Sequence, residues 1–114
     1  MKRIWMGLAG IAALVLGAVL AAAPAEQTFT GVITDSMCAR GDHSQMKMGS
    51  NDAECTIACI FAHGAKYVLF DGQEAYTLSD QKTPEKFAGR KVKVTGTLDA
   101  AAKTIAVASM AAAE

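Results

Sequence analysis

Residues 91–98 (KVKVTGTL) alternate strictly between polar and apolar side chains, which is the period of a β-strand with one buried face. Val92, Val94, Gly96 and Leu98 fall on the buried face. Gly96 has no side chain to pack, so it indicates a bulge or a barrel corner. A strand of this kind needs other strands to complete its sheet, and we expect a mostly β protein.

Four further segments have the composition of strands. Gly31 in the first of them suggests a bulge or a strong bend. The dipeptide Asp71-Gly72 is a hairpin turn signal between the second and the third. We expect the tail 111–114 (AAAE) to be frayed. The four segments are 28–35 (TFTGVITD), 66–70 (KYVLF), 74–78 (EAYTL) and 104–110 (TIAVASM).

Two helices are expected between these strands. Asn51 is a predicted N-cap with Glu54 three residues later, and Gly64 is a stop signal, which together predict a helix over roughly 52–63. Thr83-Pro84 opens a shorter helical turn that ends before Gly89.

The order of elements predicts the architecture. Five short strands with one small helix between the third and fourth match the oligonucleotide/oligosaccharide-binding (OB) barrel. The loop and helix of 36–64 would then be an insertion between strands one and two. A small open sandwich or roll is the alternative architecture.

The first 25 residues have the pattern of a signal peptide. Lys2 and Arg3 precede an apolar run that ends in the small-x-small motif of 23–25 (APA). Cleavage leaves 89 of the 114 residues, 26–114, as a single domain. We therefore expect a periplasmic or secreted protein with no stable membrane anchor after cleavage, and an oxidising environment that permits disulfides.

The charge and the motifs exclude several function classes. Loss of two basic residues leaves 9 Lys+Arg against 11 Asp+Glu, so no basic footprint for nucleic acid remains. No Ser/His/Asp arrangement, phosphate loop or paired-carboxylate signature is found, and we expect no enzyme activity. Asp35 and Asp42 are explained by turn and capping roles.

Residues 35–63 concentrate the soft metal ligands of the chain, including all three cysteines and both histidines. On the expected helix, Cys55, Cys59 and His63 are spaced four apart and share one stripe. We expect that stripe to face the loop carrying Cys38 and His43. The opposite stripe should pack on the β core, and it comprises Ile57, Ile60 and Phe61.

These residues suggest two alternative metal sites. Cys38, His43, Cys55 and Cys59 make a Cys₃His set suited to tetrahedral zinc, although the spacing is not that of a regular zinc finger. The sequence His43-x₂-Met46-x-Met48 is a His/Met cluster suited to Cu(I), because thioether, thiolate and imidazole are soft or borderline ligands.

A structural disulfide is the alternative interpretation of the cysteines. Cys38 would join Cys55 or Cys59 and leave one spare thiol, stabilising the domain by roughly 2–4 kcal/mol. The protein would then be a disulfide-stapled interaction module for another envelope protein. A redox-active or intermolecular thiol is the third reading of the odd cysteine count.

Several pieces of the chain resemble a family of short exported bacterial proteins of unknown function. The resemblance implies an OB-like β core, export, and three shared cysteines, Cys38, Cys55 and Cys59; it implies no activity. His63 departs from the glycine or small polar residue expected there. The pieces, which cover nearly all of residues 26–114, are GVITDSMCA, DAECTIACIFAHGAKYVLF, YTLSD, FAGRKVKVTGTLD and TIAVASM.

Overall fold

The structure is a computed structural model that describes residues 25–114. The predicted signal peptide lies outside the described residues, except for Ala25, and stays a prediction. Within residues 25–114, no helix combines the length and the apolar character needed to cross a bilayer.

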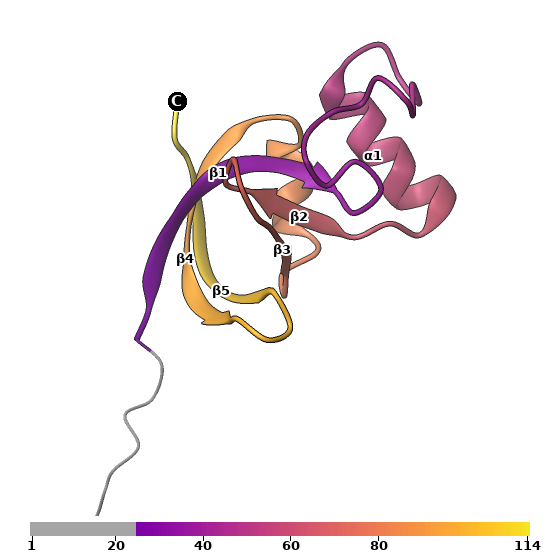
Figure 1. Cartoon of the computed structure of the whole chain (residues 1–114). Coiled ribbons are helices and arrows are strands. Elements are labelled where there is room, and N and C mark those ends of the chain that lie inside the picture. Colours follow the sequence, from indigo (N-terminus) through magenta and orange to yellow (C-terminus); the bar gives the residue numbers. More distant parts are fainter. Residues whose placement is uncertain (1–24) are drawn as a thin grey trace, which may run out of the picture.

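Five strands form a ring around one core, with a helix attached at one end (Figure 1). The ring runs in the order β1-β2-β3-β5-β4 and closes between β4 and β1. All pairs are antiparallel except β3 with β5, where Thr77 and Leu78 lie parallel to Thr104 and Ile105. The strands are β1 (Gln27–Asp35), β2 (Tyr67–Phe70), β3 (Ala75–Leu78), β4 (Lys91–Asp99) and β5 (Thr104–Ala112).

This ring confirms the predicted OB-like barrel with its insertion between the first two strands. The first strand belongs to both sides of the barrel: β1 pairs with β4 over residues 27–32 and with β2 over residues 32–35. The predicted tail is an exception, because β5 continues to Ala112, and Ala113 donates a hydrogen bond to the Lys91 carbonyl. The last residues are therefore paired rather than frayed.

Two glycines allow the barrel to close. A side chain at Gly31 would collide with the backbone carbonyl of Phe70, where β1 changes partner. A side chain at Gly96 would collide with the carbonyl of Ala106, and the β4–β5 register shifts between Thr95 and Gly96. The predicted bulge at Gly96 is confirmed, and Gly31 marks the bend of β1.

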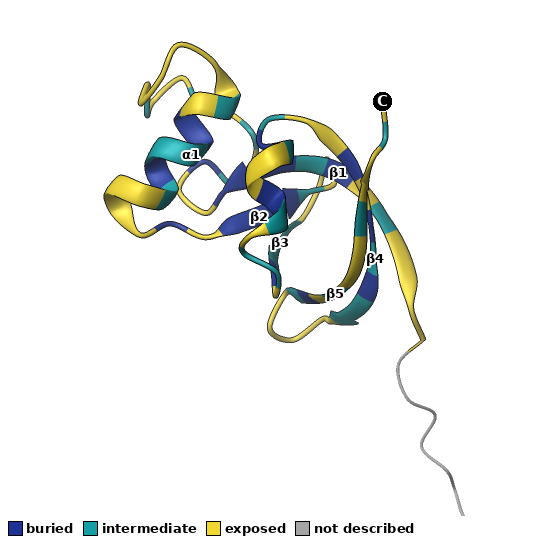
Figure 2. Ribbon diagram, turned by 180° about the vertical axis from the view of Figure 1, so that it is seen from behind, coloured by how far each residue is buried: buried dark blue, intermediate teal, exposed yellow. Residues whose placement is uncertain are grey.

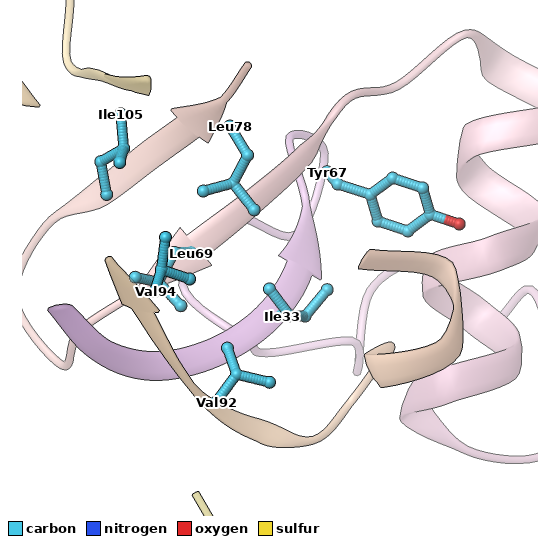
Figure 3. Packing of buried hydrophobic residues seen from close by; sticks show 7 residues of the cluster. All are labelled: Ile33, Tyr67, Leu69, Leu78, Val92, Val94 and Ile105. Carbon is cyan, nitrogen blue, oxygen red and sulfur yellow. The ribbon is translucent and has the colours of Figure 1, made fainter. Parts of the chain in front are cut away.

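The barrel interior is filled by aliphatic side chains and one tyrosine. Tyr67 differs from the others, because its ring points away from the barrel centre toward the helices (Figure 3). Tyr67 therefore closes the core on the side of the helices. The fully enclosed cluster is Ile33, Tyr67, Leu69, Leu78, Val92, Val94 and Ile105.

The helix α1 begins and ends where the capping signals predict, whereas the shorter helix is present without the predicted Thr83 cap. In α1 (Asp52–His63), the Asn51 side chain accepts a hydrogen bond from the Glu54 backbone, and Gly64 ends the helix in the left-handed conformation. The short 3₁₀ helix η1 (Thr83–Phe87) follows with Pro84 in its first turn. Gly89 lies against the start of α1, at the backbone of Ala53.

The orientation of α1 differs in part from the expectation. Its buried side chains are Cys55, Thr56 and Cys59, so the cysteine stripe faces inward, and the exposed positions lie toward the two ends of the helix (Figure 2). Phe61, expected on the inner face, is 74% exposed. Ile60 packs against both the barrel core and the cysteines, which shows that the inner face lies between the two predicted stripes.

Candidate metal centre

The last residue of β1, Asp35, carries a fully buried carboxylate. Its Oδ1 accepts hydrogen bonds from the backbone N–H groups of Met37 and Cys38, at 3.0 Å each. These bonds turn the chain from the strand into the loop and leave the other oxygen, Oδ2, without a partner. The turn role inferred from the sequence is therefore correct, but it explains only the Oδ1 atom and not the buried Oδ2 atom.

The imidazole of His43 comes from the loop and lies over the end of β1. Its side chain is 8% exposed, and its Nε2 lies 3.3 Å from the Thr34 hydroxyl. That hydroxyl donates to the Cys38 carbonyl at 2.8 Å, so it is an acceptor available to a protonated Nε2. The other nitrogen, Nδ1, faces Asp35 Oδ2 at 3.9 Å and has no hydrogen-bond partner.

Cys38 completes a group of three potential ligands. One ligand atom each from Asp35, Cys38 and His43 lies within 4.8 Å of the other two, and all three side chains are buried. Buried polar atoms normally have partners, so two orphaned atoms facing each other beside a thiol require an explanation. The three side chains are close enough to hold a metal ion.

Cys55 and Cys59 approach this group from α1. Cys55 is 2% exposed and Cys59 is fully buried. The thiol of Cys55 donates to the backbone carbonyl of Met46 and lies beside the thiols of Cys38 and Cys59. Cys55 is therefore a neighbour of both the loop thiol of Cys38 and the helix thiol of Cys59.

The electrostatics of the thiols reflect this crowding. Burial, followed by the Asp35 carboxylate and the Cys55 thiol, raises the pKa of Cys38. Burial and then Asp35 raise the pKa of Cys59 from 9.0 to about 11. Without a cation these thiols stay protonated, which is the opposite of an activated nucleophile. A cation placed among them would reverse this preference by stabilising thiolates.

A polar cleft of about 420 Å³ leads to the group from the surface. His43 and Cys55 border it, together with Asp42 and Lys47. The centre is thus reachable from solvent on one side while its ligand atoms remain buried.

The structure separates the predicted site residues into two sets. Cys38 and His43 come together, joined by Asp35, whereas Cys55 and Cys59 lie near Cys38 but outside this group, and His63 is exposed. Of the methionines within residues 25–114, only Met46 packs against the cysteines; Met37 and Met48 are 47% and 38% exposed.

The expected disulfide is not formed. All three cysteines are free thiols, so neither Cys38–Cys55 nor Cys38–Cys59 is bonded in this structure.

Asp35 is the site residue that the sequence analysis missed as a ligand. Its sequence position gives one signal, because it ends a strand three residues before Cys38 and eight before His43. A carboxylate with two oxygens can cap a turn with one and bind a cation with the other.

No family model, curated protein or solved structure matches this chain.

Proposed function

We propose that this protein is a small exported metal-binding domain that holds one zinc ion through Asp35, Cys38 and His43, with Cys55 as the fourth ligand. The observation that carries the proposal is the pair of orphaned atoms, Asp35 Oδ2 and His43 Nδ1, facing each other next to the Cys38 thiol.

The donor set favours zinc. Carboxylate oxygen, imidazole nitrogen and thiolate sulfur are all ordinary zinc ligands. Cu(I) prefers soft sulfur ligands, and a buried carboxylate is a poor ligand for it. A divalent ion also offsets the negative charges of the Asp35 carboxylate and the cysteine thiolates, which would be costly to bury without a cation.

The ion fits an exchangeable role better than a purely structural one. The barrel core and the cysteine cluster are separate groups of buried side chains, and Ile60 packs against both. The barrel can therefore fold around its own core, and the cleft beside His43 and Cys55 gives the ion a route to solvent. Storage or delivery of zinc in the cell envelope is consistent with this arrangement.

Zinc titration of the reduced, metal-free form 26–114 tests the proposal. We expect about one equivalent of zinc to bind. Cys38→Ser or His43→Gln should weaken zinc affinity by at least about tenfold, since mutation of even the outer-shell partners of metal ligands typically costs that much. His63→Gln is the matched control, because His63 is exposed. Unchanged zinc binding by the Cys38→Ser, His43→Gln double variant would contradict the proposal.

A further inference from the structure

Two thiols of α1 and one methionine side chain gather beside the centre. Cys55 and Cys59 form a buried cluster with Ala65, and the side chain of Met46 packs against it. Cys55 and Cys59 are not members of the Asp35, Cys38 and His43 set, which Cys55 adjoins through the Cys38 thiol.

The local fold holds the two thiols and the loop that carries Met46 in place. Residues four apart on a helix project from adjacent turns, which sets the Cys55 and Cys59 thiols side by side. The Cys55 thiol also donates to the Met46 carbonyl, which fixes the loop over the helix. Gly49 allows this approach, because a side chain there would press on the Cys55 backbone nitrogen at 2.9 Å.

We propose that Cys55, Cys59 and Met46 form a second subsite that selects Cu(I), adjacent to the zinc centre. Two thiols and a thioether are the soft ligands that Cu(I) prefers, and no carboxylate or imidazole is needed. The subsite deepens the proposed function, with which it shares Cys55, but Cu(I) could bind there even if zinc did not bind.

Copper competition under anaerobic, reducing conditions tests the inference. Cu(I) is supplied as a complex with a coloured chelator to the metal-free form 26–114, and transfer of copper is followed by absorbance. We expect Cys59→Ser to lower Cu(I) affinity by at least about tenfold while leaving zinc affinity nearly unchanged. We expect His43→Gln to do the opposite.

Two methionines supply the matched control. Met46→Leu should weaken Cu(I) binding, whereas Met48→Leu should not, because Met48 is exposed and only Met46 packs against the cysteines. X-ray absorption at the copper edge of the unmodified protein should show sulfur ligands alone.

The outcomes distinguish the two proposals. Copper binding without zinc binding would contradict the proposed zinc function and support the Cu(I) subsite. Zinc binding with no copper transfer, or equal loss of Cu(I) in Cys59→Ser and His43→Gln, would overturn the separate subsite. Retained zinc binding shows that the Cys59→Ser variant is folded, and nitrogen or oxygen in the copper spectrum would overturn the inference without any variant.

Discussion

The Nδ1 atom of His43 lies 3.9 Å from Oδ2 of Asp35, and neither atom has a hydrogen-bond partner. This separation is too long for a hydrogen bond. A tetrahedral zinc ion with bonds of about 2.0–2.2 Å would bring its nitrogen and oxygen ligands to about 3.4 Å. The two side chains would therefore have to approach by about 0.5 Å, a movement well within the reach of a loop residue.

Asp35→Asn should weaken zinc binding by about tenfold or more without unfolding the protein. The amide keeps an oxygen to accept from the Met37 and Cys38 backbone but removes the anionic ligand. Asp42→Asn is the control, since Asp42 is exposed and its Oδ1 likewise accepts a backbone N–H, from Ser44. Chelator competition measures both affinities, and equal values for the two variants would exclude Asp35 as a ligand.

Zinc affinity should rise with pH. Burial and the Asp35 carboxylate raise the pKa of Cys38, so at neutral pH the empty site holds a thiol proton that zinc must displace. At pH values below the pKa of Cys38, each displaced proton raises the apparent zinc affinity by about tenfold for every unit by which the pH increases. Competition titrations across neutral pH give the slope, and an affinity independent of pH would show that no thiolate binds the ion.

The metal-free protein should lose stability in alkaline solution. The pKa of Cys59 is raised from 9.0 to about 11 in the folded protein, mainly by burial. The folded state therefore keeps a proton that the unfolded chain releases, and the stabilisation is complete below pH 9 and lost as pH rises to about 11. Denaturant unfolding of the wild type and Cys59→Ser should show a smaller decline in that range for the variant. An equal decline in both would assign the alkaline loss to other groups.

Gly31→Ala should destabilise the barrel by roughly 1–3 kcal/mol, the usual range for overpacking. The added methyl group would meet the Phe70 carbonyl where β1 crosses from β4 to β2. Thr30→Ala is the control, because Thr30 is exposed on the same strand. Denaturant unfolding of both variants measures the difference. A Gly31→Ala variant as stable as the control would mean that the strands adjust to the methyl group without cost.

Local signals were sufficient to predict most of the fold. Asn51 and Gly64 define both ends of α1 because capping depends on the residues at each helix end. Strict alternation in 91–98 defines β4, and Gly96 its bulge. The end of β5 was missed because its alanines carry no alternating pattern, and their strand conformation depends on pairing with β4.

The site was harder to predict because it depends on tertiary contacts. Stripe geometry placed Cys55 and Cys59 together and toward the loop of Cys38, but it wrongly buried the whole opposite stripe. Ile60 packs on the barrel core whereas Phe61 is exposed, and nothing in the spacing distinguishes them. Asp35 was explained by its turn, and its second oxygen became significant only beside His43.

X-ray absorption at the zinc edge of the zinc-loaded form 26–114 tests the central claim most directly. The account predicts a four-coordinate ion with mixed sulfur and nitrogen/oxygen ligands, including the multiple-scattering signature of one imidazole that disappears in His43→Gln and persists in His63→Gln. A site of sulfur ligands alone, or one without imidazole, would contradict the assignment of Asp35, Cys38 and His43 as the metal centre.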